Sequence, residues 1–486
     1  MAVSPNWFAR EGLALLTDFY ELTMIAGYLH EGRADQQVCF EYFFRGMPPH
    51  AGFAVSAGLE PFVQYLEHLR FTDEDVAYLR GLNVFQEAFL EYLRDFKPRC
   101  TVRAIPEGTV VFPHEPVVQV EGPMFEAQLV ETALLNFLNY QTLIATKAAR
   151  ICLAAEGEPV LEFGLRRAHG PDGGLSGSRA AYIGGCSSTS NVLAGKTYGI
   201  PLSGTHAHSW VMSFSSELEA FRAFARHYPE RCVLLVDTYD TIESGVPNAI
   251  RVFKEMHAAG RKVRPAIRLD SGDLAKLSKA AYRLMREAGF DDPLIVASND
   301  LEEDLIADLK RQGARINAWG VGTHLITSHD CPSLGGVYKL VSVYKDGRWT
   351  PRMKTTANVE KSTDPCRKQV VRYYNDAGQP VGDVLYEYDE MIPECGAIVG
   401  HHRTQQNVHT RLRDTRRSES LMEAVFREGR RVGAAPGIDE IRARATAQIA
   451  ALADEFKRLR NPEIYKVMLS ERIGHAKMKL LESLEP

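Results

Sequence analysis

The feature that most constrains this chain is a series of short apolar runs between residues 158 and 345, most of them separated by segments with helical periodicity. Eight such runs occur, at residues 160–163, 182–183, 201–202, 233–236, 266–269, 294–297, 316–319 and 337–340. The second run also fits the end of a helix, and the third is short. Regular alternation of strands and helices predicts a parallel sheet, and eight units favour a TIM-like α/β barrel, regular or irregular in detail.

Polar residues and glycines collect directly after seven of these runs. They stand at residues 164–167, 184–188, 204–208, 237–240, 270–273, 298–300 and 320–323. One such loop means little, because ordinary turns favour the same residue types. In a parallel barrel, however, the carboxyl ends of all strands face one rim, where such folds place their active sites. The recurrence therefore predicts one site built from loops that lie far apart in the sequence.

The two terminal regions lack this alternation. Residues 1–150 combine helical segments with paired strands, and residues 346–486 contain further strands and two closing helices. We therefore expect an N-terminal α+β domain at 1–150, the barrel at 151–345, and a C-terminal region at 346–486 that packs back on the N-terminal domain. Together the terminal regions would form one α+β domain beside the barrel.

Composition limits the class of protein. A chain of 486 residues, 45% hydrophobic and 24% charged, is typical of a soluble globular protein with more than one core. Its formal net charge of −5 argues against a nucleic-acid partner. The eight cysteines are scattered without a C-x-x-C pair, no apolar run is long enough for a membrane helix, and no signal peptide is indicated. We expect a cytoplasmic protein with no membrane partner.

A glycine loop and an aromatic–arginine pair indicate an anionic, phosphorylated ligand. Gly320, Gly322 and Thr323 follow the seventh run, where barrels often bind phosphate through backbone N–H groups. Phe163 and Arg166 follow the first run, and they offer a ring for stacking and a guanidinium for an anion. A tight turn and simple core packing are the alternatives for these two features.

Four aspartates follow two successive runs, and they predict oxygen ligands. Asp237 and Asp240 follow the fourth run, and Asp270 and Asp273 follow the fifth. Such carboxylates suit Mg²⁺ held mostly by substrate phosphates, or the hydroxyls of a ribose. We predict Asp237, Asp240 and Asp273 as the metal-side residues. Helix capping is the alternative, because Asp commonly caps helices.

Two histidines, His206 and His208, stand two residues apart after the third run. Because the chain leaves the strand there, the two imidazoles need not share one role; we expect His208 to act in catalysis and His206 to support it. A zinc-dependent barrel hydrolase is an alternative, but it needs further histidines at later strand ends, and only His324 is nearby.

With these residues in view, the sequence resembles nicotinate phosphoribosyltransferases. The resemblance rests on stretches that occur in order over residues 15–345: LTDFY (16–20), FEYFFR (40–45), EFGLRRA (162–168), STSN (188–191), AHS (207–209), DSGD (270–273) and GVGT (320–323). It implies transfer of a phosphoribosyl group from phosphoribosyl pyrophosphate to nicotinate, which forms nicotinate mononucleotide and pyrophosphate as the first step of NAD salvage from nicotinate. It also implies ATP as a co-substrate, coupled through a phosphohistidine, and Mg²⁺.

The resemblance also implies roles for individual residues. His208 matches the phosphorylated histidine. Tyr20 and Phe163 match the rings that enclose the pyridine, with Tyr20 supplied by the partner subunit of a homodimer. The remaining matches are Arg166 on the base and phosphate side, Arg268 and Asp270 on the ribose and pyrophosphate side, Gly320, Gly322 and Thr323 at the 5′-phosphate, and Ser188 or Ser190 at the nicotinate carboxylate.

Two rivals remain within the same binding chemistry. A nicotinamide phosphoribosyltransferase would need an acceptor for an amide N–H₂, and residues 187–191 contain no carboxylate. A non-catalytic regulator would bind phosphoribosyl pyrophosphate without turnover, and the intact His208 argues against it.

Overall fold

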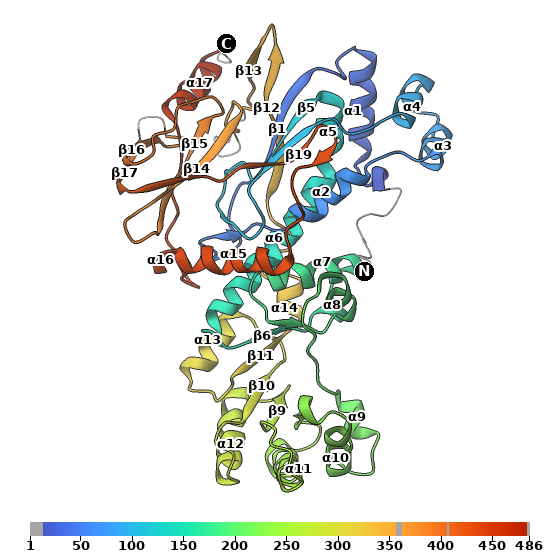
Figure 1. The fold of residues 1–486 in the computed structure, drawn as a ribbon, viewed down its shortest axis with the longest axis vertical. Helices are drawn as coiled ribbons and strands as arrows, with labels where there is room; N and C mark the ends of the chain where they lie inside the picture. Colours follow the sequence, from blue (N-terminus) through green and yellow to red (C-terminus); the bar gives the residue numbers. More distant parts are fainter. Residues whose placement is uncertain (1–12, 356–361, 406–407, 484–486) are drawn as a thin grey trace. The chain divides into compact units, whose positions relative to one another are not determined.

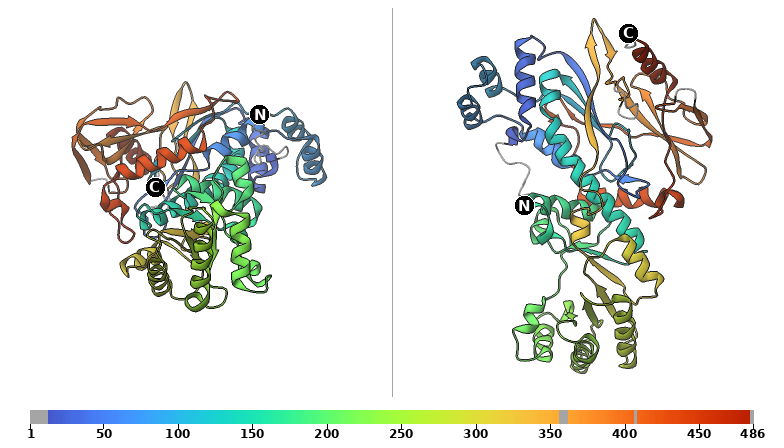
Figure 2. Two further views of the ribbon diagram at one scale, coloured as in Figure 1. Left: turned by 60° about the horizontal axis from the view of Figure 1, so that its bottom comes forward. Right: turned by 180° about the vertical axis from the view of Figure 1, so that it is seen from behind.

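The computed structural model of the chain describes residues 13–355, 362–405 and 408–483. The chain divides into two compact units, which Figures 1 and 2 show in ribbon form. Unit 1 comprises Met1–Thr146 and Ser333–Pro486, and unit 2 comprises Lys147–Pro332. The N-terminal and C-terminal parts of the chain thus belong to one unit.

Unit 2 is built on a parallel sheet, sheet C, of six strands. Their order is β7 (Ser188–Thr189), β6 (Val160–Glu162), β11 (Ala318–Val321), β10 (Leu294–Ala297), β9 (Ala266–Leu269) and β8 (Val233–Leu235). Every neighbouring pair is parallel. Apart from β7, the strands are mostly apolar, because both faces of a parallel sheet are covered.

Helices connect these strands. They are η2 (Leu165–Arg167), α7 (Gly170–Ile183), α8 (Val192–Tyr198), α9 (His208–Met212), α10 (Glu217–His227), η3 (Pro229–Arg231), η4 (Thr241–Gly245), α11 (Val246–Ala258), α12 (Leu274–Glu287), α13 (Glu303–Arg311) and α14 (Thr323–Ile326). Helix α12 shows why they form: Asp273 caps its first turn, and Leu274, Ser278 and Met285 bury one face at helical spacing.

The mixed α/β class is confirmed, but the eight-stranded barrel is not. Of the predicted strands, the run at 182–183 is the end of α7, and the run at 337–340 belongs to β12 (Gly336–Lys345) in unit 1. The run at 201–202 makes only one parallel bridge, between Leu202 and Thr189. Sheet C therefore keeps two edges, at β7 and β8, with residues 201–203 extending the first.

Unit 1 contains an antiparallel sheet, sheet A, that draws on both terminal regions. Its seven strands, in order, are β13 (Arg348–Pro351), β12, β1 (Gln37–Phe44), β5 (Val118–Pro123), β3 (Thr101–Ala104), β19 (Glu423–Arg427) and β20 (Arg430–Arg431). The orange β12–β13 hairpin beside the blue β1 is visible in Figure 1. Residues from the N-terminal and C-terminal regions therefore share one hydrogen-bonded sheet.

A second sheet in unit 1, sheet D, is formed by the C-terminal region alone. Its order is β17 (His409–Thr415), β16 (Gly396–His401), β21 (Val467–Leu469), β15 (Pro380–Glu387), β14 (Lys368–Tyr374) and β18 (Arg417–Ser420). A short pair, β2 (Ala54–Val55) and β4 (Val110–Val111), completes the strands of unit 1. The helices of this unit are η1 (Leu13–Leu15), α1 (Phe19–His30), α2 (Leu59–His68), α3 (Asp73–Gly81), α4 (Glu87–Arg94), α5 (Met124–Leu129), α15 (Ile438–Ala451), α16 (Asp454–Lys457) and α17 (Glu471–Glu482), and α6 (Glu131–Ala154) contains the boundary between the units.

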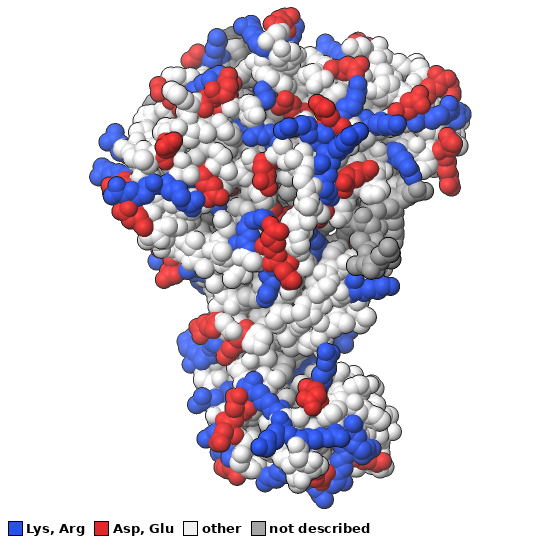
Figure 3. Space-filling model, in the orientation of Figure 1, with Lys and Arg blue, Asp and Glu red and all other residues white. Residues whose placement is uncertain are grey.

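The arginine-rich stretch 403–431 is paired with carboxylates at several points. Arg403 binds the buried Asp364 through Nε, and Arg431 binds Glu60 at 2.8 Å. On the face shown in Figure 3, acidic side chains lie among the basic ones. No helix among the described residues combines the length and apolarity that crossing a bilayer requires.

Candidate active site

The register of sheet C brings the predicted site residues of unit 2 to one face. Ser188 pairs with Leu161, Leu161 pairs with Gly320, and Arg268 pairs with both Val296 and Leu235. Paired residues on adjacent strands, and every second residue along a strand, point to the same side. The face at the carboxyl ends therefore carries Phe163, Ser188, Ser190, Asp237, Arg268, Asp270, Ser298, Gly320 and Gly322.

His208 lies at the start of α9 with each ring nitrogen near a polar partner. Its Nδ1 is 3.2 Å from Thr238 Oγ1. Its Nε2 is 3.9 Å from Asp237 Oδ1 and 3.8 Å from Asp270 Oδ2. The side chain is 41% exposed, whereas that of Asp237 is 1% exposed. One edge of the ring thus faces two carboxylates, while the side chain remains accessible to a ligand.

His206 has a different, structural environment. Its Nε2 accepts a hydrogen bond from the backbone N–H of Leu235, at 3.2 Å. Burial lowers the pKa of His206 to about 4, so the ring is neutral near pH 7. The bond is made to β8, an edge strand of sheet C, on the side where a closed barrel would have a further strand. The imidazole thus connects the loop that carries His208 to sheet C.

Arg268 connects three strand ends. Its Nε donates to Ser298 Oγ at 2.8 Å, Nη1 to Thr205 Oγ1 at 3.1 Å, and Nη2 to Asp270 Oδ1 at 2.7 Å. Burial alone would raise the pKa of Asp270, but the hydrogen bond from Ser298 and the charge of Arg268 outweigh burial and lower it. Asp270 is therefore ionised at neutral pH.

The three aspartates predicted on the metal side differ in their contacts. Asp237 Oδ2 accepts hydrogen bonds from Asp270 N and Ser271 Oγ, both at 2.7 Å, while its buried Oδ1 has no hydrogen-bond partner among the described residues. Asp240 accepts from two amides at the start of η4, and Asp273 caps α12. The caps account for Asp240 and Asp273, and no cluster of three metal-ligating side chains is found in the described ranges.

Phe163 and the glycine loop fit closely together. A Cβ on Gly320 would lie 2.8 Å from the Phe163 ring, and one on Gly322 would lie 3.3 Å from the Phe163 carbonyl oxygen. The Arg268 guanidinium carbon lies 5.8 Å from the centre of the Phe163 ring. Gly320 is therefore required for the ring to lie across β11. Thr323 begins α14, whose first amides lack partners within the helix.

The remaining predicted residues of unit 2 differ in exposure. Ser188 is buried at 7% exposure, and its Oγ has no hydrogen-bond partner among the described residues. Ser190 is partly buried, and Arg166 is exposed in η2. A buried hydroxyl without a partner costs free energy, so Ser188 is the better of the two serines for a hydrogen bond to a ligand.

Tyr20 belongs to unit 1, on helix α1. Its side chain is 47% exposed, and burial of its hydroxyl end together with Glu131 raises its pKa. Leu16, Phe19 and Met24 are also exposed, by 37%, 53% and 37%. Their spacing places them with Tyr20 along one side of α1 and of the turn before it, which gives an apolar stripe on the surface of unit 1.

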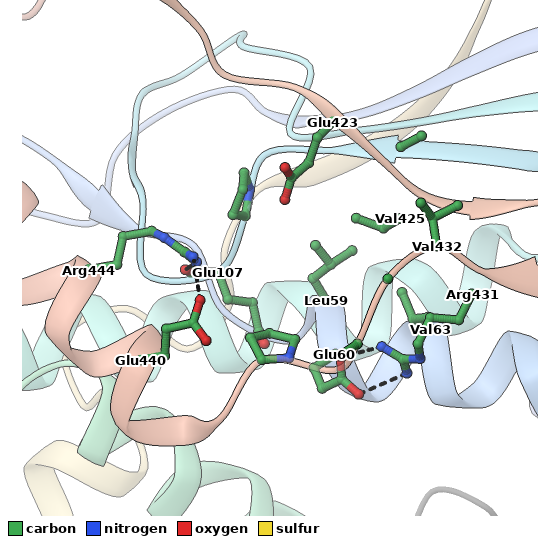
Figure 4. A pocket seen from close by; sticks show the side chains of 15 residues that line it. Leu59, Glu60, Val63, Glu107, Glu423, Val425, Arg431, Val432, Glu440 and Arg444 are labelled. Atoms are coloured by element: carbon green, nitrogen blue, oxygen red, sulfur yellow. Dashed lines mark hydrogen bonds and ion pairs between the residues drawn. The ribbon is translucent and has the colours of Figure 1, made fainter.

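Unit 1 also contains a pocket of about 330 Å³, shown in Figure 4. It lies beside α2, β19 and α15 and contains none of the predicted site residues. Arg431 is held there by Glu60, and Arg444 is held by Glu440 and the Glu107 carbonyl. Both arginines thus already have acceptors, which does not favour a site for a phosphorylated anion.

Comparison with known proteins decides the family. Family models for the nicotinate phosphoribosyltransferase N-terminal domain, family and C-terminal domain match residues 15–139, 159–416 and 367–477. The chain belongs to the nicotinate phosphoribosyltransferase family. It is 45% identical to nicotinate phosphoribosyltransferase of Bacillus subtilis, over 98% of this chain and 99% of the relative. It is 42% identical to nicotinate phosphoribosyltransferase pncB2 of Mycobacterium tuberculosis, over 95% and 92%.

A solved structure supports the same assignment. The crystal structure of human nicotinic acid phosphoribosyltransferase matches 97% of this chain and 100% of its own, with a TM-score of 0.83 and 35% identity. The resemblance seen in the sequence is therefore confirmed across nearly the whole chain, including both terminal regions.

In this member of the nicotinate phosphoribosyltransferase family, four hydroxyl residues of the site were not singled out from the sequence. Thr205 and Ser298 bind Arg268, Thr238 contacts His208, and Ser271 binds Asp237. All four lie in the polar loops that follow the strands. Their position in those loops was the available signal, but Ser and Thr are too common in turns to be chosen from it alone.

Proposed function

We propose that this chain transfers a phosphoribosyl group to nicotinate and couples the transfer to ATP hydrolysis through phosphorylated His208. Formation of nicotinate mononucleotide and pyrophosphate from nicotinate and phosphoribosyl pyrophosphate is the activity of its family. The observation that carries the coupling is the placement of His208, with Nε2 facing Asp237 and Asp270 and Nδ1 on the opposite side of the ring.

This placement favours Nδ1 as the nucleophile. Two carboxylates near Nε2 favour the tautomer that keeps its proton there, which leaves the lone pair on Nδ1. Nδ1 then attacks the γ-phosphorus of ATP: a P–N bond forms, the bond to the β,γ-bridging oxygen breaks, and ADP leaves with the electron pair. The phosphorylated imidazole is cationic, and Asp237 stabilises it.

We propose that nicotinate binds on the same face of sheet C. The Phe163 ring offers one stacking surface, and exposed Arg166 adds positive charge. The Ser188 hydroxyl, which has no partner in the part of the chain that the structure describes, can donate to the carboxylate. The pyridine nitrogen attacks C1 of the ribose, and the C1–O bond breaks with its electron pair leaving on pyrophosphate. Because the pyridine nitrogen carries no proton, no general base is needed, and catalysis is by orientation and charge stabilisation.

The phosphates and ribose are assigned to the adjacent strand ends. Arg268 and Asp270 serve the pyrophosphate and ribose side, and Gly320, Gly322 and Thr323 serve the 5′-phosphate. Mg²⁺ fits this rim, because the buried Asp237 Oδ1 lacks a partner among the described residues and Asp270 lies beside it. These two carboxylates would hold Mg²⁺ together with substrate phosphates, and the ion would neutralise phosphate charge. Asp240 and Asp273 stay predictions, and their capping bonds weigh against them.

We place Tyr20 in the active site of a second subunit of a homodimer. The exposed apolar stripe of Leu16, Phe19, Tyr20 and Met24 supports this proposal, because such stripes commonly mark subunit interfaces. Tyr20 would then cover the pyridine face opposite Phe163.

The decisive test compares nicotinate with nicotinamide as acceptor, each with and without ATP. We expect nicotinate mononucleotide formation that ATP stimulates, together with ADP production. Equal use of nicotinamide would instead favour a nicotinamide phosphoribosyltransferase. Binding of phosphoribosyl pyrophosphate without any product would favour the regulator.

A further inference from the structure

A buried polar network lies behind the proposed nicotinate pocket, on the opposite face of sheet C. Its centre is Glu162, which is 1% exposed. Glu162 Oε1 accepts from the backbone N–H of Gly164, and Oε2 accepts from Thr189 Oγ1 at 2.5 Å and from Ser178 Oγ at 2.9 Å. One carboxylate thus binds the turn after β6, the strand β7 and the helix α7.

Asn191 extends this network. Its Nδ2 donates to Ser178 Oγ at 3.1 Å and to the Gly174 carbonyl at 3.2 Å, and its backbone N–H donates to Thr189 Oγ1 at 2.9 Å. Its Oδ1 accepts from Ala194 N and so caps α8. Ser178, Thr189 and Asn191 are all buried to 2% exposure or less. The network is therefore almost completely shielded from solvent.

The residues of this network alternate with those of the proposed pocket. In the stretch 188–191, Ser188 and Ser190 lie on the site face, while Thr189 and Asn191 are anchored behind it. The two neighbours of Phe163 in the chain also belong to the network, because the Gly164 backbone N–H donates a hydrogen bond to the Glu162 carboxylate. Gly164 has no room for a side chain, since a Cβ there would lie 2.5 Å from Ile326.

We propose that Glu162 is a positioning residue that fixes the spacing between the Phe163 ring and the Ser188 hydroxyl, and thereby sets the affinity for nicotinate. This inference rests on the proposed function. Glu162 does not touch the substrate: it holds the two segments that do, from the other side of the sheet. Stacking on Phe163 and the hydrogen bond from Ser188 to the carboxylate must form at the same time. Loss of the spacing therefore weakens nicotinate binding, although the residues that bind nicotinate are unchanged.

Two helix serines provide a matched test. Ser178 on α7 and Ser278 on α12 are both 0% exposed, and each hydroxyl donates to a carbonyl of its own helix. The single Ser178 hydroxyl proton is shared between this carbonyl and Glu162 Oε2, whereas the Ser278 hydroxyl accepts a hydrogen bond from Arg315 N, ahead of β11. Ser178→Ala and Ser278→Ala thus delete the same group from the same kind of position. Only the first touches the network.

The Michaelis constants for nicotinate and for phosphoribosyl pyrophosphate are measured on the full chain at saturating concentration of the other substrate. We expect Ser178→Ala to raise the Michaelis constant for nicotinate roughly fivefold, which is the effect of losing one buried hydrogen bond. The Michaelis constant for phosphoribosyl pyrophosphate should stay within about twofold of its original value. Ser278→Ala should lower only the thermal midpoint. A merely structural role would lower the folded fraction, and hence the maximal rate, without moving either Michaelis constant.

Glu162→Gln is the stronger perturbation, because one oxygen acceptor must then serve three donors. In Glu162→Gln, the Michaelis constant for nicotinate should rise roughly tenfold or more. The inference is overturned if the two serine variants behave alike, or if both Michaelis constants rise together. Failure of the proposed function is separate: it would appear as no nicotinate mononucleotide from the unaltered chain, or as an unchanged constant in Phe163→Ala.

Discussion

Asp237→Asn is the sharpest perturbation of the proposed phosphorylation step. In the unaltered chain, Asp237 Oδ2 accepts from Asp270 N and Ser271 Oγ, and Oδ1 faces His208 Nε2 at 3.9 Å. An asparagine of the same shape must turn its oxygen toward the two donors. Its N–H₂ group then faces Nε2 and favours a lone pair there, which moves the ring proton to Nδ1 and removes the nucleophile.

The size of the effect follows from the same distance. When the phosphorylated ring carries a positive charge, attraction to Asp237 across 3.9 Å is worth about 4 kcal/mol at an effective dielectric constant of about 20. Because the His208 side chain is 41% exposed, solvent removes roughly half of this, which leaves about 2 kcal/mol. That corresponds to a loss of about thirtyfold in the rate of phosphorylation.

The assay is the rate of acid-labile phosphoenzyme formation from ATP, measured over a range of Mg²⁺ concentrations. We expect the thirtyfold loss to persist at saturating Mg²⁺. If excess Mg²⁺ restores the full rate, the loss comes from the metal-ligand role of Asp237 alone, and its proposed effect on the His208 tautomer is refuted. An unchanged rate at all Mg²⁺ concentrations would remove Asp237 from both roles.

Three further predictions concern other parts of the site. Arg268→Ala deletes hydrogen bonds to Ser298, Thr205 and Asp270, and it should raise the Michaelis constant for phosphoribosyl pyrophosphate by roughly tenfold or more. Initial-rate measurements test this, and an unchanged Michaelis constant would exclude Arg268 from the site. Mixing Tyr20→Ala chains with His208→Ala chains should give mixed dimers with partial activity if Tyr20 serves the partner's site, and mixed dimers as inactive as the parents would contradict sharing. The pKa of His206 is about 4 in the folded chain and about 6.5 in the unfolded chain, so the folded chain binds fewer protons between these pH values. The free energy of unfolding should therefore be highest above pH 6.5 and fall by roughly 3 kcal/mol as the pH drops to 4. His206→Gln should flatten this part of the pH dependence in chemical unfolding, and an equal slope in both proteins would show that another group titrates there.

The rim of the site could be predicted because its signal is local. Every strand of sheet C except β7 contains a short apolar run, and the polar residues that follow the run are adjacent to it in the sequence. That was enough to bring Phe163, Asp237, Arg268 and Asp270 to one edge of the sheet without knowing which strands are neighbours. Hydrogen bonds join Arg268 to Asp270 and Asp270 to Asp237, and the Arg268 guanidinium carbon lies 5.8 Å from the centre of the Phe163 ring, so the four residues do lie together.

The predicted eight-stranded barrel is not confirmed, because an apolar run does not indicate which strand it pairs with. The run at 182–183 is the buried end of helix α7, and a short buried apolar run has the same sequence pattern in a helix as in a strand. The run at 337–340 pairs with β1, some 300 residues earlier in the chain, and no local pattern encodes that choice. At the gap that remains, a single imidazole, His206, binds β8 in place of a strand.

Which residues of the rim face the ligand is decided by register, and register depends on neighbouring strands. Read as sequence, Ser188-Thr189-Ser190-Asn191 offers four similar polar side chains, and a choice between Ser188 and Ser190 could not be made. Once β7 pairs with β6, Thr189 must lie on the side of Glu162, and its two serine neighbours must lie on the other side. Glutamate is rarely buried, and nothing next to Glu162 in the sequence indicates that its carboxylate is buried behind the sheet. The alternation that places Thr189 beside Glu162 also places Ser188 on the other face, so the position of Ser188 depends on contacts made behind the sheet.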